Sequence, residues 1–416
     1  MSKNILVGQS GGPTAVINAS LYGIIKEAAA HCDKVGHVYG MINGIEGFLS
    51  GHVMDLSAEL SDEDLELLRL TPAAYLGSCR YKLPENLDAS VYTLLFEKFE
   101  QLNIGAVFYI GGNDSMDTAD KLSRWAANNH KDISFIGVPK TIDNDLALTD
   151  HTPGFGSAAK YIAASTKEVI RDAEGLTYKK NMITIMEIMG RNAGWLPGAT
   201  ALSKSEDREG PDLIYLPEVP FDMEKVLAKV KDLLKKKSSV VIAVSEGIKL
   251  ADGRYVCELG SVGDYVDAFG HKQLQGTATY LANFLAAECG CKTRAVELST
   301  LQRSASHMAS RVDIDEAMMV GGAAVKAADE GDTGKMVVID RVSDDPYMAA
   351  TGIYDVHRIA NEEKLVPRSW MNKDANNVTK DFIDYIKPLI QGDYQPIMVN
   401  GVPRHLVLNT GRKKKN

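Results

Sequence analysis

Apolar and polar positions change their period repeatedly along the chain. Short apolar runs rich in β-branched residues occur near residues 4–8, 105–110, 133–138, 182–187, 240–244, 293–298 and 336–340. The stretches between them repeat their apolar positions with the period of an amphipathic helix. Strands that alternate with helices in this way are typical of doubly wound α/β proteins with parallel sheets. We therefore predict an α/β fold.

The composition is that of a large globular protein. The chain has 416 residues, which is long enough for two or more hydrophobic cores. Of these residues, 45% are hydrophobic and 24% are charged, which is usual for a globular protein. No apolar run approaches the roughly 20 residues of a membrane-spanning helix. The N-terminus enters a strand without a signal region. We therefore expect a cytoplasmic protein that has no membrane partner.

Charge limits the kind of ligand further. The net charge of −9 argues against general nucleic-acid binding. The basic run 235–237 closes an amphipathic helix, where lysines suit the negative helix end. An anionic substrate must therefore be met by local basic residues rather than by the field of the whole protein.

Phosphate chemistry is indicated where the predicted strands end. Gly11-Gly12 and Gly111-Gly112 each follow an apolar strand, a layout that lets backbone N–H groups approach a phosphate. The loop 139–145 follows a third strand and carries a lysine, a threonine and two aspartates. Because such strand ends share one edge of a parallel sheet, they predict a single crevice. Together these segments indicate phosphoryl transfer.

A series of motifs now makes a family resemblance specific. They occur in the order and rough spacing of the 6-phosphofructokinase family, over about residues 5–305, and the chain resembles most closely the pyrophosphate-dependent branch of that family. The motifs are Gly11-Gly12, Gly77-Ser78-Cys79-Arg80, Gly111-Gly112-Asn113-Asp114-Ser115, Pro139-Lys140-Thr141-Ile142-Asp143-Asn144-Asp145, Met189-Gly190-Arg191-Asn192-Ala193-Gly194, Glu246-Gly247 and Gln302-Arg303.

The resemblance implies two similar doubly wound α/β domains with the active site in the cleft between them. We expect residues 1–140 to form a phosphoryl-donor (pyrophosphate) domain that is completed by 252–305. Residues 141–251 are expected to form the sugar-phosphate domain, and 306–416 a C-terminal extension that packs on the core. The resemblance also implies a homodimer or homotetramer with shared active sites, in which Arg294 reaches in from a neighbouring subunit.

The resemblance assigns roles to individual residues. It makes Asp143 the base that takes the proton from the sugar 1-hydroxyl, and it places Asn113 and Asp145 at a Mg²⁺ site. Pyrophosphate contacts are expected from Gly12, Gly11, Arg80, Gly112 and Ser115. Contacts with fructose 6-phosphate are expected from Thr141, Ile142, Asp143, Met189, Gly190, Arg191, Glu246, Arg294 and Arg303.

Two further catalytic-site residues indicate the phosphoryl donor. ATP-using members of the family have glycine where this chain has Asp114, because the nucleotide α-phosphate lies against that position. They also have glycine where this chain has Lys140, whose ammonium suits a leaving phosphate. A carboxylate about 4 Å from a phosphate charge repels it by roughly 4 kcal/mol at an effective dielectric of about 20. The pair predicts pyrophosphate as donor.

The expected activity is reversible phosphoryl transfer from pyrophosphate to fructose 6-phosphate, giving fructose 1,6-bisphosphate and phosphate, in glycolysis and gluconeogenesis. The chain departs from the family pattern at two positions of the sugar site. The family commonly has a histidine where this chain has Thr300, and an arginine where it has Met182. Lys179 or Lys180 could take the place of that arginine. An ATP-dependent phosphofructokinase would need room at Asp114. A kinase of the NAD or diacylglycerol type shares only the glycine turn, and a non-catalytic regulatory phosphosugar-binding subunit would be expected to lose the base.

Overall fold

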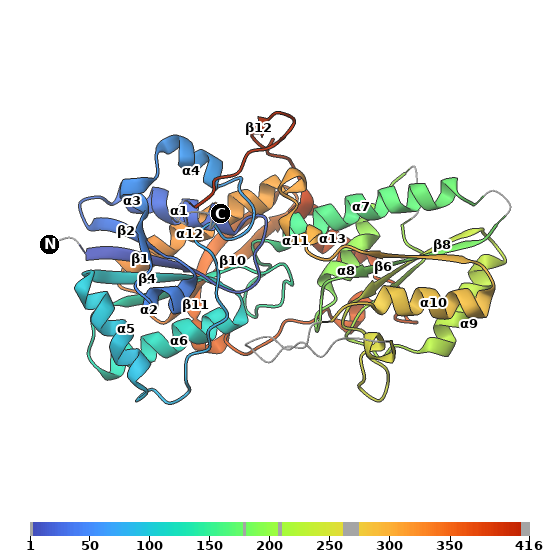
Figure 1. Ribbon diagram of the computed structural model, residues 1–416, viewed down its shortest axis with the longest axis horizontal. Coiled ribbons are helices and arrows are strands. Elements are labelled where there is room, and N and C mark those ends of the chain that lie inside the picture. Colours follow the sequence, from blue (N-terminus) through green and yellow to red (C-terminus); the bar gives the residue numbers. More distant parts are fainter. Residues whose placement is uncertain (1–2, 178–179, 207–209, 261–273, 409–416) are drawn as a thin grey trace, which may run out of the picture.

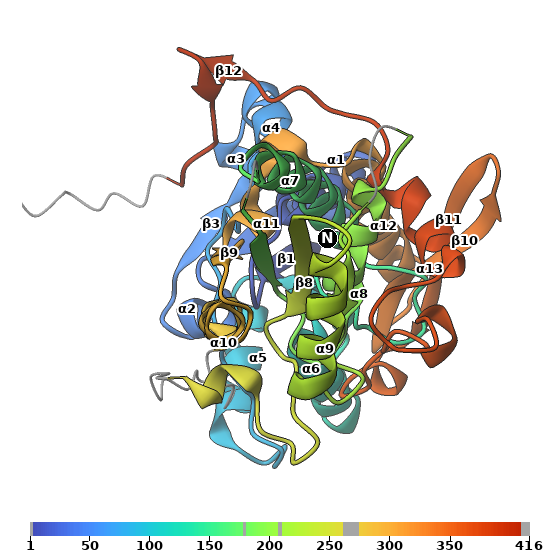
Figure 2. The same cartoon turned by 90° about the vertical axis from the view of Figure 1, so that its right-hand side faces the viewer.

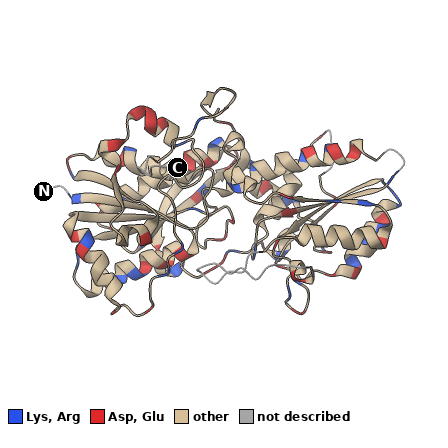
Figure 3. Cartoon of the chain, in the orientation of Figure 1, with Lys and Arg blue, Asp and Glu red and all other residues tan. Residues whose placement is uncertain are grey.

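The chain folds into two α/β domains that lie side by side (Figure 1). The computed structural model describes residues 3–177, 180–206, 210–260 and 274–408. No helix within these ranges is long and apolar enough to cross a membrane. Acidic and basic residues are interspersed over both domains (Figure 3). The predicted two-domain α/β fold is confirmed.

The first domain is built on a seven-stranded sheet in the order β11-β10-β5-β4-β1-β2-β3. The strands from β10 to β2 are parallel to their neighbours, whereas the edge strands β11 and β3 are antiparallel. The strands are β1 (Lys3–Gln9), β2 (Val35–Met41), β3 (Val53–Asp55), β4 (Ile104–Gly111), β5 (Ser134–Pro139), β10 (Lys335–Asp344) and β11 (Tyr347–Asp355).

Alternating side chains of this sheet bury two separate cores. In β1, Ile5 and Val7 pack on the face covered by helices α1 (Ile17–Ala30) and α12 (Arg311–Asp329). Leu6 points to the opposite face, where it packs with α5 (Ser90–Gln101) and α6 (Asn113–Asn128). Both faces are covered, which explains why the strands read as continuous apolar runs.

The second domain holds a four-stranded parallel sheet in the order β7-β8-β6-β9. Helices α7 (Phe155–Gly175) and α10 (Thr277–Cys289) cover its opposite faces (Figures 1 and 2). Helix α9 (Met223–Leu234) joins α10 in the core of one face, and α8 (Trp195–Ala199) and α13 (Lys380–Ile386) join α7 on the other. The strands are β6 (Met182–Ile188), β7 (Leu213–Tyr215), β8 (Ser239–Ser245) and β9 (Lys292–Glu297).

Short elements complete the described chain. The remaining α-helices are α2 (Gly44–Leu49), α3 (Leu56–Glu59), α4 (Asp62–Leu68) and α11 (Leu301–Ser304). The 3₁₀ turns are η1 (Thr200–Ser203), η2 (Val256–Leu259), η3 (Ser306–Met308), η4 (Val356–Arg358), η5 (Arg368–Trp370) and η6 (Lys387–Ile390). A small hairpin of β12 (Met398–Val399) and β13 (Val402–Pro403) projects from the first domain (Figure 2).

Two predicted domain boundaries are wrong. Residues 252–305 do not complete the first domain, because β9 pairs with β6 and α10 packs on both strands. Residues 306–416, predicted as an extension that packs on the core, are themselves part of both domains, because α12 and β10 are integral to the first domain and α13 packs in the second. Local apolar patterns identify strands but not the sheet that each one joins. The chain consequently crosses between the domains after β5, after β9, after β11 and again after η6.

A buried ionic cluster ties the first crossing loop to the first domain. The imidazole of His151 lies between two carboxylates, with Nδ1 at 2.7 Å from Asp150 and Nε2 at 2.6 Å from Glu316 on α12. Arg341 of β10 also binds Asp150, at 2.9 Å. Burial lowers the pKa of His151, but the two carboxylates outweigh it and raise the pKa to about 9. The loop between β5 and α7 is therefore anchored by a charged histidine.

Replacing His151 by alanine should destabilise the protein by about 3–5 kcal/mol, because the carboxylates of Asp150 and Glu316 lose their buried partner. The raised pKa stabilises the fold fully below pH 6.5 and loses that effect as pH rises through about 9. Denaturant unfolding at pH 6 and pH 10 measures both effects. His52→Ala, at an exposed histidine, is the control. Equal losses at the two pH values would contradict a charged His151.

Candidate active site

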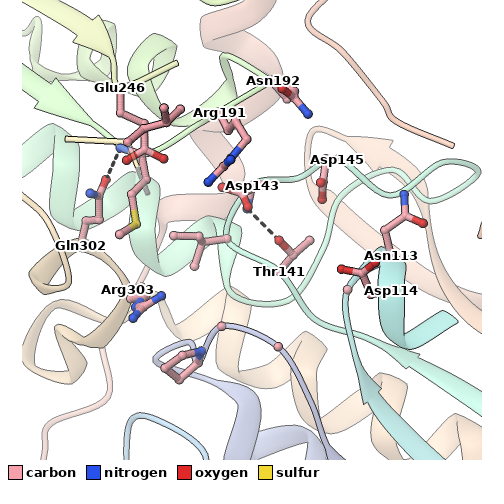
Figure 4. Close-up of a pocket in the computed structure, with 18 of the residues that line it drawn as sticks. Asn113, Asp114, Thr141, Asp143, Asp145, Arg191, Asn192, Glu246, Gln302 and Arg303 are labelled. Atoms are coloured by element: carbon pink, nitrogen blue, oxygen red, sulfur yellow. Dashed lines mark hydrogen bonds between the residues drawn. The ribbon is translucent and has the colours of Figure 1, made fainter. Parts of the chain in front are cut away.

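A cavity of about 1150 Å³ lies between the two domains and is lined by residues of both (Figure 4). The ends of β1, β4 and β5 reach it from the first domain, and the ends of β6 and β8 from the second. Both parallel sheets thus point the carboxyl ends of their strands at one space, which is where ligands bind in open α/β folds.

Helix α6 begins directly after Gly111 and Gly112. Strand β4 ends at Gly111, and α6 begins at Asn113 with Asp114 in its first turn. A Cβ atom on Gly111 would lie 1.9 Å from the hydroxyl oxygen of Ser115, so only glycine lets the helix start this close to the strand. The first N–H groups of a helix lack partners within it and favour anions. Asp114 is an acidic residue at a helix end that otherwise favours a phosphate.

Cations gather around the Gly11-Gly12 turn. The Nζ atom of Lys140 donates a hydrogen bond to the carbonyl of Gly12 at 2.6 Å. A Cβ atom on Gly12 would come within 3.3 Å of the Arg303 guanidinium, which explains a residue without a side chain here. Arg80 approaches the same turn, because Gly11 N–H donates to the neighbouring Cys79 carbonyl at 3.4 Å. These groups form a site for a multiply charged anion.

The pKa shifts of these cations also indicate an anion site. Burial lowers the pKa of Lys140 to about 8, although the negative charge of Asp143 opposes this shift. Burial also lowers the pKa of Arg303, and the nearby Arg80 adds to the effect by repulsion. Positive charges that destabilise one another are relieved by a bound anion. The site therefore favours a phosphate-like ligand over water.

The loop 141–145 carries two carboxylates opposite this cationic end. Asp143 N–H donates to the Thr141 hydroxyl at 3.1 Å, which fixes the turn (Figure 4). Burial raises the pKa of Asp143, while Lys140 and Arg191 oppose the shift. Burial and the neighbouring Asp143 raise the pKa of Asp145 to about 7. Two buried carboxylates this close call for a cation or a proton between them.

The two predicted metal ligands differ in what surrounds them. Oδ1 of Asp145 is buried and has no hydrogen-bond partner among the described residues, which suits an oxygen ligand waiting for a cation. Asn113 is engaged elsewhere: its Oδ1 accepts from Asn361 N–H at 2.5 Å, and its Nδ2 donates to the Glu362 carbonyl at 2.7 Å. Within the described ranges no group of three or more His, Cys, Asp or Glu residues could hold a metal ion by itself.

The second domain supplies a glycine turn of its own. Gly190 has φ of +137°, and its carbonyl accepts from the Ser245 hydroxyl at 2.6 Å. Met189 N–H donates to the side chain of Gln302 at 3.1 Å, so the turn is tied to the segment that carries Arg303. Arg191 follows the glycine and lines the cavity. The turn thereby presents a guanidinium to the cavity from a fixed backbone.

Glu246 faces the same part of the cavity. Burial raises its pKa to about 8, with further contributions from Asp143 and Glu187, while Arg191 opposes the shift. Glu187, at the end of β6, was missed by the sequence analysis. Its Oε2 accepts from Ala278 N–H at 2.8 Å at the start of α10, and burial raises its pKa to about 7. One charged residue in an otherwise apolar strand was the signal that could have identified it.

Most residues predicted from the sequence line this one cavity. Gly190 is absent from the lining although both its neighbours line it. Arg294 also lies outside it: NH1 donates to Asp172 on α7 at 2.5 Å. Thr300 lines the cavity, Met182 begins β6, and Lys179 lies outside the described residues. The predicted residues in the lining are Gly11, Gly12, Arg80, Gly112, Asn113, Asp114, Ser115, Lys140, Thr141, Ile142, Asp143, Asp145, Met189, Arg191, Glu246 and Arg303.

The C-terminal part of the chain contributes residues that the sequence analysis did not identify. Asn361 and Glu363 line the cavity, and Glu363 accepts a hydrogen bond from Asn192 of the second-domain turn at 2.8 Å. They follow η4 in a segment with no phosphate-type glycine turn and no apolar period. No sequence signal distinguishes them, because their role depends on how the chain returns across the cavity.

Comparisons with known proteins agree with this site. A sequence model of the family described as Phosphofructokinase matches residues 4–328. Pyrophosphate–fructose 6-phosphate 1-phosphotransferase from Halomonas elongata is 42% identical over 402 residues, which cover 96% of this chain and 95% of that protein. The enzyme of the same name from Xanthomonas campestris is 41% identical and covers 97% of this chain and 96% of its own.

A solved structure is similar over nearly the whole chain. The crystal structure of pyrophosphate-dependent phosphofructokinase from Nitrosospira multiformis has a TM-score of 0.89 and 38% sequence identity. The match covers 98% of this chain and 97% of that one. The similarity therefore includes the C-terminal part that crosses the cavity.

Proposed function

Because the chain belongs to the phosphofructokinase family, we propose that it transfers a phosphoryl group from inorganic pyrophosphate to the 1-hydroxyl of fructose 6-phosphate. The products are fructose 1,6-bisphosphate and phosphate, and the reaction runs in either direction in glycolysis and gluconeogenesis. The observation that carries the proposal is the cavity itself, in which the Asp143 carboxylate interacts with Lys140, Arg191 and Arg303, and which Asp114 also lines. The enzyme works in the cytoplasm.

Asp143 acts as the base toward the sugar hydroxyl. Its carboxylate must be ionised to take a proton, and burial alone would oppose that state. Lys140 and Arg191 oppose the shift that burial causes in its pKa, because their positive charges favour the ionised carboxylate. Arg191 and Glu246 hold the sugar, because a guanidinium supplies fixed donors and a carboxyl group exchanges hydrogen bonds with hydroxyls. We assign Arg303 to the sugar phosphate.

Pyrophosphate binds in the first domain. The Gly11-Gly12 turn and the N-terminus of α6 supply backbone N–H groups, with Arg80 and Ser115 beside them. Lys140 lies where positive charge stabilises the phosphate that leaves. The low pKa of this lysine does not remove its charge when a phosphate is bound, because the anion raises the pKa again.

Mg²⁺ is the cofactor that these residues fit. Asp145 is its protein ligand, since Oδ1 is buried without a hydrogen-bond partner among the described residues. When bound there, Mg²⁺ would neutralise part of the charge of pyrophosphate. Asn113 instead fixes the main chain at Asn361 and Glu362, because both ends of its amide are already used.

Asp114 selects the donor. It occupies the first turn of α6 and lines the cavity, so the α-phosphate of a nucleotide would have to lie against its carboxylate. Repulsion of roughly 4 kcal/mol at about 4 Å corresponds to nearly three decades in affinity or rate. A non-catalytic phosphosugar-binding protein would need neither this discrimination nor the base.

The oligomer is a homodimer or homotetramer in which a neighbouring chain completes the sugar-phosphate site. Arg294 supports this arrangement, since its guanidinium lies outside the cavity of its own chain on the edge strand β9. From that surface it can reach the cavity of a second copy. The substrates account for the remaining partners, and neither nucleic acid nor membrane is among them.

Removing the base tests the mechanism. Asp143→Asn nearly preserves volume but cannot accept the hydroxyl proton, so kcat should fall by roughly 10²–10⁴. The KM values for both substrates should change little. Asp132→Asn, at an exposed aspartate, is the control for substitution as such. Steady-state assay of bisphosphate formation measures the effect, and a near-normal kcat in Asp143→Asn would assign proton removal to another group.

Donor choice is tested by changing the two residues that determine it. Asp114→Gly with Lys140→Gly should shift the ratio of kcat/KM for ATP over pyrophosphate by roughly 10²–10⁴, which brackets the repulsion computed above. Much of the shift should come from lost pyrophosphate activity, because Lys140 neutralises the leaving phosphate. Parallel assays of fructose 6-phosphate and Mg²⁺ with each donor measure the ratio.

The variant Asp114→Asn separates charge from volume at the same position, and Asp132→Asn, at an exposed aspartate outside the cavity, is its control. Wild-type protein that uses ATP but not pyrophosphate would overturn the proposed function. An unchanged donor ratio in a folded double variant would place donor selection in other residues.

Sharing of the site is tested by mixing two proteins that are each impaired at a different residue. Arg294→Ala should raise KM for fructose 6-phosphate about tenfold or more and that for pyrophosphate far less, because a charged contact with the sugar phosphate is worth about 1.5–3 kcal/mol. Hybrids with Asp143→Ala should regain activity, since one composite site then holds both intact groups. The absence of recovery in hybrids verified by mass would mean that one chain forms the whole site.

A further inference from the structure

A C-terminal segment crosses the mouth of the cavity between the two domains. After β11 and η4 the chain leaves the first domain, and residues 361–364 pass beside the cavity before α13 packs on the second domain. We call residues 361–364 the clasp. Asn361 and Glu363 of the clasp line the cavity, and its contacts reach both domains.

On the donor side the clasp is held by Asn113. This residue is the first of α6 and precedes Asp114, the residue assigned to donor choice. Its side-chain oxygen accepts from Asn361 N–H at 2.5 Å, and its amide donates to the Glu362 carbonyl at 2.7 Å. Both polar ends of one side chain are thus spent on the clasp backbone.

On the acceptor side the clasp is held by Asn192. Its amide donates to Oε1 of Glu363 at 2.8 Å, next to Arg191 in the second-domain turn. The indole of Trp195, three residues further on, donates to the Lys364 carbonyl at 2.8 Å. The second-domain turn, which we assign to the sugar, is therefore linked to the clasp. Helix α6, which we assign to pyrophosphate, is linked to the same four residues.

The centre of the clasp supports the catalytic loop. Lys364 N–H donates to the Asp145 carbonyl at 2.8 Å, and Glu363 pairs with Leu146 in an antiparallel bridge. The ammonium group of Lys364 donates to the carbonyls of Thr149 and Asp150, at 3.2 and 2.6 Å. The loop with the base and the metal ligand is thereby attached to the clasp along its length.

We propose that the clasp sets the spacing between the donor and acceptor halves of the active site, with Asn113, Asn192 and Glu363 as positioning residues. This inference rests on the proposed phosphoryl transfer. The hydroxyl of the sugar and the transferred phosphoryl group are held by different domains, so the alignment of attack depends on how the domains are joined. A displacement of about 1 Å between reacting groups costs about 100-fold in rate.

Hydrogen bonding, and not charge, carries the clasp's role. Each contact of Asn113 is made by a neutral amide with a backbone group, and Glu363 needs only an oxygen acceptor to bind Asn192. A metal-ligating Glu363 would need its negative charge. The two roles therefore predict opposite results for a change of Glu363 to glutamine.

The test compares Asn192→Ala, Glu363→Ala and Glu363→Gln with the wild type in the pyrophosphate reaction. Opening the acceptor-side contact with either alanine should lower kcat by about 10–100-fold and leave both KM values within about threefold, because each half still binds its own ligand. Glu363→Gln should keep kcat within about threefold, since its amide oxygen still accepts from Asn192. Loss of activity in Glu363→Gln equal to that in Glu363→Ala would overturn the positioning role and assign the carboxylate to the metal.

Asn372→Ala is the matched control. Asn372 makes an equivalent double amide contact with Asn376 in the same C-terminal region, but neither residue lines the cavity. It should lower thermal stability without lowering kcat. If Asn372→Ala lowers kcat as much as Asn192→Ala does, the effect is general destabilisation and the proposal fails.

Hydrogen–deuterium exchange provides a readout that does not need activity. Asn113→Ala should speed exchange of the clasp peptide by at least tenfold, because Asn361 N–H loses its acceptor. Asn372→Ala should leave that peptide unchanged. Unchanged exchange in Asn113→Ala would overturn the clasp even if wild-type protein transfers phosphate from pyrophosphate. An inactive wild type would instead refute the proposed function, while the exchange result would still judge the contact.

Discussion

The structure depends on confining opposite charges to one buried space between two domains. Lys140 and Arg303 are buried there, and so are Asp143 and Glu246. Because burial favours the neutral form of each group, it lowers the pKa of the two cations and raises the pKa of the two carboxyl groups. The attraction between Asp143 of the first domain and Arg191 of the second opposes the rise in the Asp143 pKa only while the domains stay close. A bound anion and a bound cation would complete this balance of charge.

This confinement requires the loop between the domains to be rigid. Asp313 of α12 accepts from Gly154 N–H and Ser157 N–H, each at 2.8 Å, and so fixes the start of α7. His151 anchors the same loop through Glu316. The loop that carries Asp143 therefore belongs to the first domain by its hydrogen bonds, although the helix that follows it covers the sheet of the second domain. Together these hydrogen bonds hold the buried carboxylate of Asp143 in place against the charges of its neighbours.

Local patterns could predict the fold class and most of the cavity, because glycine turns and charged loops at strand ends depend on near neighbours in sequence. They could not show that β9 joins β6, since a strand's partner is chosen by packing of distant elements. They also could not show that Asn113 spends both polar ends on the clasp, or that Arg294 points away from its own cavity. Those outcomes depend on where the chain returns, and the clasp residues carry no periodic or motif signal.

Donor choice and the alignment of donor and acceptor rest on interactions that act over different distances. In the proposed mechanism donor choice depends on charge, which acts over several ångströms without exact contact, so one carboxylate, that of Asp114, is sufficient and can be recognised in the sequence. Alignment of donor and acceptor depends on hydrogen bonds, which fail within about 1 Å and must come from wherever the chain can supply them. In this protein they come from residues some 170 to 250 positions further along the chain than Asn113 and Asn192. Selectivity can therefore change by point substitution, whereas alignment requires the C-terminal crossing to be retained as a whole.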